Sequence, residues 1–216
     1  MSNTLTPLAQ EIVRLHGDKQ AGEPMPHLGT DRPALQAAIG MALGQLGFTL
    51  ADADVVRRAW LNQSLRLGGF DPQHWPTDPI DFGLSTQRRP MSFAPCPKKL
   101  GLYAVLPDAD WVARMAHAGV PTLQLRYKSE DRQAIDHQVK AAVAAVQGTQ
   151  SLLFINDHWA SAIEHGAYGV HLGQEDLRDA PIERLRLSGL RLGVSTHGYA
   201  EMLKAEAVAP SYMALG

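Results

Sequence analysis

The sequence predicts an α/β protein whose main part, residues 100–216, is of the (β/α)8 TIM-barrel type. Three observations indicate this. Strand-length apolar runs alternate with helical runs from residue 100 onward, helical periodicity dominates residues 1–67, and prolines crowd the stretch between them. Regular alternation of strands and helices is typical of right-handed βαβ units around a parallel sheet. We therefore expect a helical segment at 1–67, a proline-rich linker at 68–99 and a barrel domain at 100–216.

Apolar residues at helical spacing predict three helices in the first segment, over residues 7–16, 33–46 and 50–67. Gly47 is placed to end the second helix, and Gly68 to end the third. Helices of this size bury too little apolar surface to form a large core alone. We expect them to pack on further parts of the chain.

The linker has prolines at positions 72, 76, 79, 90, 95 and 97 and no sustained apolar period. Such a composition predicts an extended segment. Four aromatic residues are nevertheless present, namely Phe70, Trp75, Phe82 and Phe93. We expect these side chains to pin the linker to a neighbouring surface rather than to bind a ligand, because large aromatic side chains are seldom left in solvent.

The barrel domain is predicted to contain six strands, over residues 100–106, 122–128, 151–157, 169–174, 191–197 and 211–216. Five helices are expected between them, over residues 110–119, 131–148, 158–166, 181–189 and 199–210. A complete (β/α)8 barrel takes about 250 residues, and eight units at this spacing would need about 50 more residues than are present. The barrel is therefore expected to be incomplete.

Composition excludes several classes of function. The formal net charge is -2, so a general attraction to nucleic acid or to an anionic membrane is not indicated. The single cysteine, Cys96, excludes an intramolecular disulfide and a cysteine-rich zinc site. The first residues lack a secretory apolar core, and no run approaches the length of a membrane span. We expect a cytoplasmic protein; its oligomeric state is left open.

Polar residues occupy one face of the second predicted strand. The two-residue period of a strand places Gln124, Arg126 and Lys128 together, opposite the apolar face that must meet the helices. Unpaired cations in a barrel interior would be costly, so an anionic partner is implied. The alternative is a purely structural network in which these cations pair with Asp157 or Asp176.

Two aspartates follow the third and fourth predicted strands. Neighbouring strand ends lie about 5 Å apart, so Asp157 and Asp176 are expected to share one cation. Carboxylate oxygens with few other protein ligands suit Mg²⁺, which commonly bridges to substrate phosphates. The alternative is that each aspartate only caps the helix that follows it.

The fifth predicted strand ends in Ser195, Thr196 and His197. We do not expect a nucleophilic serine, because adjacent strand residues face opposite ways, no GxSxG motif is present and no acid is placed to orient His197. Hydroxyl donors to a phosphate or a substrate ring are expected instead. His171 is predicted to be a packed histidine, and the helical histidines are predicted to lie at the surface or its boundary: His117, His137 and His165.

Four motifs in order and register, QLRYK at 124–128, LFIND at 153–157, GVHLGQED at 169–176 and GVSTH at 193–197, closely resemble thiamine phosphate synthase. The resemblance implies a (β/α)8 barrel and a transferase of thiamine biosynthesis. That enzyme couples hydroxymethylpyrimidine diphosphate with a thiazole phosphate and releases diphosphate. Its partners would thus be small-molecule substrates.

The resemblance also implies roles for individual residues. The pyrimidine diphosphate would be held by Gln124, Arg126, Lys128 and Asn156, and Mg²⁺ by Asp157 and Asp176. Ser195 would lie against the leaving diphosphate, so that the catalytic residues are Arg126, Lys128 and Ser195. The family continues past the sixth strand with a threonine- and lysine-bearing loop and glycine-rich turns, which this sequence does not contain.

Residues 29–65 resemble the carboxyl-terminal helical hairpin of hydroxymethylpyrimidine phosphate kinase. The phosphate-binding Gly-Thr-Gly-Cys of that family is replaced, since Gly29 and Thr30 precede Asp31 and Arg32, so we interpret residues 1–67 as a non-catalytic remnant or docking element. Two alternatives to a synthase remain: a thiazole tautomerase, against which the two metal-binding acids argue, and a catalytically inactive binding protein.

Overall fold

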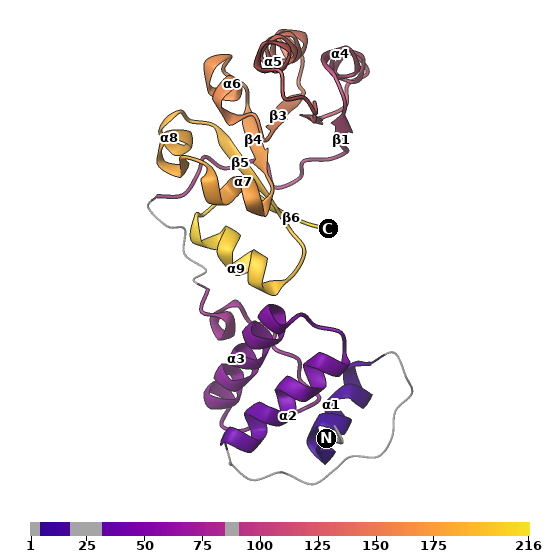
Figure 1. The fold of residues 1–216 in the computed structure, drawn as a ribbon, viewed down its shortest axis with the longest axis vertical. Coiled ribbons are helices and arrows are strands. Elements are labelled where there is room, and N and C mark those ends of the chain that lie inside the picture. Colours follow the sequence, from indigo (N-terminus) through magenta and orange to yellow (C-terminus); the bar gives the residue numbers. More distant parts are fainter. Residues whose placement is uncertain (1–4, 18–31, 85–90) are drawn as a thin grey trace. The chain divides into compact units, whose positions relative to one another are not determined.

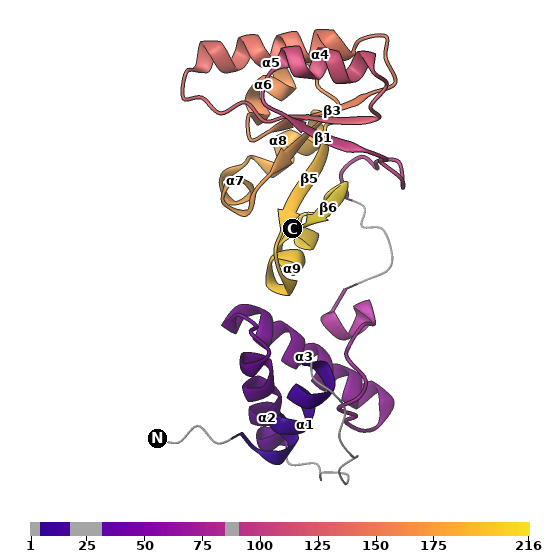
Figure 2. The ribbon, with the colours of Figure 1, turned by 90° about the vertical axis from the view of Figure 1, so that its right-hand side faces the viewer.

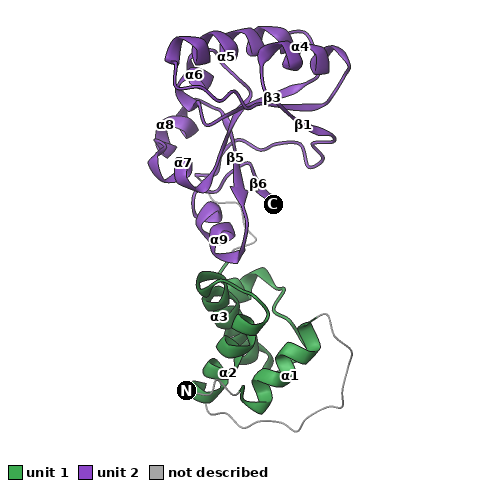
Figure 3. Cartoon of the chain, turned by 45° about the vertical axis from the view of Figure 1, so that its right-hand side comes forward, with its two compact units in different colours: residues 1–88 green, residues 89–216 purple. Residues whose placement is uncertain are grey.

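A computed structural model describes residues 5–17, 32–84 and 91–216 of the chain (Figure 1). The chain divides into two compact units, residues 1–88 and residues 89–216 (Figure 3). The proline-rich segment is shared between them, because its first part belongs to the first unit and its last part to the second. In the described residues no helix is long and apolar enough to cross a membrane.

Three helices form the first unit: α1 (Pro7–His16), α2 (Arg32–Gln45) and α3 (Leu50–Leu67). These helices agree with the predicted ranges to within a residue. Threonine side chains accept a backbone N–H at the start of α1 and of α3, and Gly68 ends α3 in the left-handed conformation with φ 81°. Local capping signals therefore define the helix limits.

The aromatic residues of the first part of the linker pack against α3. The ring of buried Trp60 lies 5.1 Å from that of Trp75 and 5.4 Å from that of Phe70. A short 3₁₀ turn, η1 (Pro79–Phe82), follows, and its buried Asp81 accepts two hydrogen bonds from Arg66. This part of the segment is thus pinned to the helices by its aromatic side chains, as expected.

The second unit is an α/β fold around one six-stranded parallel sheet, in the strand order β1-β2-β3-β4-β5-β6. Its strands are β1 (Tyr103–Leu106), β2 (Thr122–Leu125), β3 (Leu152–Asn156), β4 (Gly169–Leu172), β5 (Arg191–Thr196) and β6 (Tyr212–Leu215). Its helices are α4 (Ala109–His117), α5 (Arg132–Val146), α6 (Trp159–Glu164), α7 (Gln174–Asp179), α8 (Ile182–Leu187) and α9 (Tyr199–Ala207). The helices wrap one face of the curved sheet (Figures 1 and 2).

The predicted α/β fold with barrel-type βα units is confirmed, with one correction. The strand expected at 169–174 ends at Leu172, and a helix absent from the prediction, α7, begins at Gln174. The polar sequence after Gly173 gave no apolar period from which a six-residue helix could be recognised. Asp176 therefore lies in the first turn of a helix and not at a strand end.

The two faces of the sheet differ in character. Side chains such as Leu123, Leu153 and Val170 point toward the helices and are completely buried. On the opposite, inner face, the parallel register aligns Asn156 with His171 and His171 with Gly193. Because paired residues of parallel strands point to the same face, polar groups from successive strands meet there.

The sheet is curved strongly enough to bring its two edge strands together through their side chains. The hydroxyl groups of Tyr103 on β1 and Tyr212 on β6 lie 2.7 Å apart. Both rings also pack on Phe154 of β3, at ring distances of 6.0 and 5.2 Å. The inner face is therefore concave, and tyrosines span the gap between its edges.

Candidate active site

A pocket of about 710 Å³ lies on the concave inner face. Its lining includes most of the polar residues singled out from the sequence, together with residues that were not: Leu100, Tyr103, Val105, Gln124, Arg126, Asn156, Asp157, His171, Gly173, Asp176, Ser195, His197, Tyr212 and Ala214. The structure thus gathers residues from β1 to β6 and from the following loops in one concavity.

Asp157 and Asp176 both line this pocket. Burial, followed by the nearby carboxylate of Asp176, raises the pKa of Asp157 to about 6. Two carboxylates close together repel each other when both are ionised. A cation between them would remove this repulsion, as the shared site predicted from the sequence requires.

The backbone of Asp157 is unusual, with φ at 60° in the left-handed region. Asparagine and aspartate adopt this conformation more readily than other residues except glycine. Its N–H still donates to the carbonyl of His171, at 3.0 Å, and so extends the β3–β4 ladder by one bond. The turn therefore holds the carboxylate firmly at the end of β3.

The capping alternative for the two aspartates is wrong. The N-cap of α6 is His158 and that of α7 is Gly173, and neither makes a side-chain capping bond. Asp157 precedes the N-cap of α6, and Asp176 lies inside α7. Helix capping therefore does not explain why carboxylates occupy these two positions.

Arg126 and Lys128 lie beyond the end of β2 and are exposed, whereas Gln124 within the strand is buried. The expectation that all three share a buried face is wrong for the two cations, because the strand ends at Leu125. Arg126 lines the pocket and Lys128 does not. Among the described residues no ion pair joins either cation to an aspartate of the pocket, although the charge of Arg126 favours the ionised form of Asp157.

A chain of hydrogen bonds begins at Asp157 and crosses the inner face. The side-chain amide of Asn156 donates to the Asp157 carboxylate, and Gln124 Nε2 donates to Asn156 Oδ1 at 2.7 Å. The hydroxyl of Tyr103 donates to Gln124 Oε1 at 2.9 Å. Gln124 and Asn156 are thus held in fixed orientations before any ligand binds.

The same chain continues to Ser195. The Tyr212 hydroxyl lies 2.7 Å from that of Tyr103 and 2.8 Å from His171 Nδ1. Nε2 of His171 lies 2.7 Å from the Ser195 hydroxyl. Burial, aided by the charge of Arg126, lowers the pKa of His171 to about 4, so the ring is neutral near pH 7.

Ser195 is paired with His171, while the adjacent His197 is exposed and contacts Glu201, with 3.0 Å between Nδ1 and Oε2. The prediction that no acid is placed to orient His197 is wrong, since Glu201 lies one helical turn further on. His171 is buried, as predicted, but it also lines the pocket.

The pocket also contains Tyr103 and Tyr212, which the sequence pattern did not single out, and His171, which was predicted only to be packed. Each lies on the inner face of its strand. The two-residue period alone would have indicated this orientation. The pairing among them depends on strand register and sheet curvature, which the sequence does not state.

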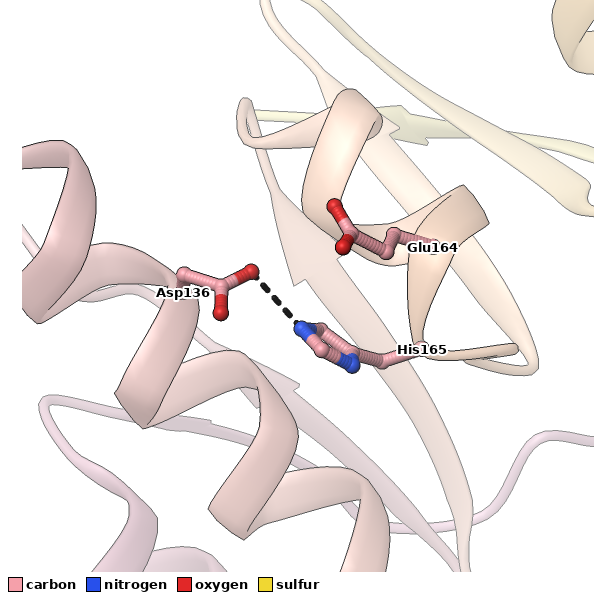
Figure 4. A group of neighbouring side chains, drawn as sticks. All are labelled: Asp136, Glu164 and His165. Carbon is pink, nitrogen blue, oxygen red and sulfur yellow. Dashed lines mark hydrogen bonds and ion pairs between the residues drawn. The ribbon is translucent and has the colours of Figure 1, made fainter.

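A separate group of potential metal ligands lies on α5 and at the end of α6 (Figure 4). It consists of Asp136, Glu164 and His165, with His165 Nε2 and Asp136 Oδ1 2.7 Å apart. None of the three lines the pocket. We interpret this group as a helix-to-helix surface contact, with His165 at the protein boundary as expected.

The raised pKa of Asp157 predicts how stability depends on pH. A carboxyl group that binds its proton more tightly in the folded state stabilises the fold below its unfolded pKa, and this contribution is lost as pH rises through the folded pKa of about 6. In metal-free buffer we expect Asp157→Asn to unfold at a higher temperature than the unchanged protein at pH 8. The difference should vanish near pH 4; a constant difference across this range would contradict the assignment.

Comparisons with known proteins agree with this geometry. A family model described as thiamine monophosphate synthase matches residues 102–216. The thiamine-phosphate synthase of Neisseria meningitidis serogroup A is 52% identical over 126 residues, which is 58% of this chain and 62% of that protein. The enzyme of Cronobacter sakazakii is 53% identical over 124 residues, covering 57% and 59% of the two chains.

A solved thiamine phosphate pyrophosphorylase from Pyrococcus furiosus matches with a TM-score of 0.48 and 27% identity, over 54% of this chain and 60% of that one. The chain spans about three fifths of the length of the curated relatives that it matches. The family model, in contrast, covers more than half of this chain and includes every residue of the pocket except Leu100. The chain therefore belongs to the thiamine monophosphate synthase family.

Proposed function

We propose that this chain acts as a Mg²⁺-dependent thiamine phosphate synthase of the cytoplasm. The substrates would be hydroxymethylpyrimidine diphosphate and a thiazole phosphate, and the products thiamine phosphate and diphosphate. The single observation that supports this best is the pocket itself, in which two close carboxylates and an arginine without an ion pair to any described residue line the same concavity as an ordered pair of amides. The curated relatives carry the name of this activity.

The residues fit a magnesium ion by their chemistry. Mg²⁺ is bound in proteins by one or two carboxylates, with waters and substrate phosphate oxygens completing its coordination. Asp157 and Asp176 supply two carboxylates, and the pKa of Asp157 is raised first by burial and then by the nearby carboxylate of Asp176. A bound Mg²⁺ would supply positive charge to the diphosphate as it leaves.

The chain's own residues would position the pyrimidine substrate. The buried amide of Gln124 and the amide of Asn156 are already oriented by their mutual hydrogen bond, so they present fixed groups to a heterocycle. Arg126 is exposed at the mouth of the pocket and forms no ion pair with its aspartates, so its guanidinium is available to a diphosphate. Fixed donors and charges of this kind stabilise developing charge without reorganisation.

In this reaction the carbon–oxygen bond to diphosphate breaks, and the bonding electron pair leaves with the diphosphate. The electron-rich pyrimidine carries the resulting positive charge, and the lone pair of the thiazole nitrogen forms the new carbon–nitrogen bond. No protein nucleophile is needed, which agrees with the engagement of Ser195 by a neutral histidine. Catalysis would rest on positioning and on charge stabilisation by Arg126.

An assay of product formation tests the proposal. The full chain is mixed with both substrates and Mg²⁺, and thiamine phosphate is measured by chromatography. We expect product only when all three are present, and Arg126→Gln to lower kcat/KM by about 100-fold because it removes a charge-assisted contact to the diphosphate. Lys140→Gln, an exposed change on α5, should leave the rate unchanged. Absence of product from correctly folded protein would refute the synthase activity of this chain.

A further inference from the structure

The hydrogen-bond chain from Asp157 to Ser195 has a direction that its donors and acceptors determine. The side chain of Asn156 turns its NH₂ group toward the carboxylate of Asp157 and donates to it. Asn156 Oδ1 then accepts from Gln124 Nε2, which leaves Gln124 Oε1 as an acceptor. Tyr103 must donate its only hydroxyl hydrogen to that oxygen.

The donor and the acceptor of each remaining contact follow from the number of hydrogens that each side chain carries. Tyr103 has no second hydrogen, so at 2.7 Å it can only accept from Tyr212. Tyr212 has then used its own hydrogen, and the His171 nitrogen 2.8 Å away must donate. A neutral imidazole protonated on Nδ1 has an unprotonated Nε2, which accepts from the Ser195 hydroxyl at 2.7 Å.

We propose that Tyr103 and Tyr212 are positioning residues that hold His171 as the neutral Nδ1–H tautomer, with its unprotonated Nε2 accepting the hydrogen of Ser195. Five side chains thus transmit the orientation set by one carboxylate to a serine on the far side of the pocket. We call this hydrogen-bond chain the relay; it runs from Asp157 through Asn156, Gln124, Tyr103, Tyr212 and His171 to Ser195. Its two tyrosines come from opposite edges of the sheet, so the relay depends on the curvature of the sheet.

The surroundings of Tyr103 and Tyr212 keep the hydroxyl proton on each of these two side chains. Burial raises the pKa of Tyr103 to about 12 and raises that of Tyr212 further, so both phenols remain protonated. The fold also makes room for the relay at Gly193. A Cβ at this position would overlap the Tyr212 hydroxyl and lie 2.6 Å from His171 Nδ1.

The relay has a consequence for catalysis, and this part rests on the proposed function. A pyrimidine that becomes cationic is destabilised by a neighbouring positive charge and stabilised by lone pairs. A neutral His171 hydrogen-bonded to Ser195 adds no positive charge to this wall of the pocket. Loss of the Tyr212 hydroxyl should therefore lower kcat by about tenfold, the value of one hydrogen bond, with little change in KM.

Nuclear magnetic resonance of the ¹⁵N-histidine-labelled full chain reads the tautomer directly and needs no activity. We expect the signal of His171, identified by its loss in His171→Gln, to show the Nδ1–H pattern at pH 7. Tyr212→Phe removes the acceptor of Nδ1–H and should move His171 toward the Nε2–H form, whereas Tyr127→Phe, whose hydroxyl lies outside the relay, should not. An Nε2–H or a protonated His171 in the unchanged protein would overturn the proposal.

The tautomer of His171 and the synthase activity are tested by separate measurements, so either can be refuted without the other. If the tautomer is as expected but no thiamine phosphate forms, the relay stands and the proposed function is refuted. If product forms but His171 carries its proton on Nε2, the relay is refuted and the proposed function stands. Retention of the Nδ1–H signal in folded Tyr212→Phe would show that Tyr212 does not select the tautomer.

Discussion

Asp157→Asn should weaken the Mg²⁺-dependent binding of diphosphate by about 100-fold, because one of two carboxylates that hold the cation is lost. Asparagine is the substitution of choice, since it keeps the size of the side chain and tolerates the left-handed backbone at φ 60°. Alanine would add backbone strain to the loss of the ligand. Isothermal titration calorimetry with inorganic diphosphate, at fixed Mg²⁺ concentration, measures the change.

The control for this variant is Asp179→Asn. Asp179 lies on α7 and is exposed, as Asp176 is, but it is paired with Arg178 and does not line the pocket. The Asp179→Asn protein should bind diphosphate as tightly as the unchanged protein does. Equal weakening by both variants would show that the overall negative charge matters and not a metal site between Asp157 and Asp176.

Gly193→Ala should destabilise the second unit by about 2 kcal/mol, because the added Cβ overlaps the Tyr212 hydroxyl and approaches His171 Nδ1. His171 is buried and Tyr212 is half-buried, and a hydrogen bond joins the two, so neither can move aside freely. For a chain of this size the change corresponds to a fall of roughly 4–8 °C in Tm. Thermal unfolding followed by circular dichroism measures it.

A double variant tests whether Gly193→Ala destabilises the protein through overlap with the Tyr212 hydroxyl or through a general effect on β5. In Gly193→Ala with Tyr212→Phe the phenolic oxygen, one of the overlapped atoms, is absent. The combined loss of stability should therefore be smaller than the sum of the two single losses. Strict additivity would mean that Gly193 is not required by the tyrosine.

The sequence predicted the presence of the helices and strands better than the residues at which they begin and end. Helices α1 and α3 and the six strands follow from apolar period, proline and glycine positions, which are local properties. Helix α7 was missed because a polar six-residue helix has no periodic signal. The exposure of Arg126 and Lys128 was mispredicted because β2 ends at Leu125, and strand ends are set by tertiary contacts.

The candidate site was predicted in part for the same reason. Asp157 and Asp176 could be placed together because the ends of adjacent parallel strands meet at one edge of a sheet. The contact between Ser195 and His171 could not be foreseen, since it depends on the register of β4 against β5. The meeting of Tyr103 with Tyr212 depends on curvature across the whole sheet, which no local pattern encodes.

The central claim is that the pocket is a site for a divalent cation and a diphosphate together. The most direct test is a calorimetric titration of the unchanged protein with diphosphate, with and without Mg²⁺, at pH 8. We expect tight binding with Mg²⁺ and little or none without it, since Asp157 and Asp176 would otherwise repel the anion. Equal binding in the presence and absence of Mg²⁺ would contradict it.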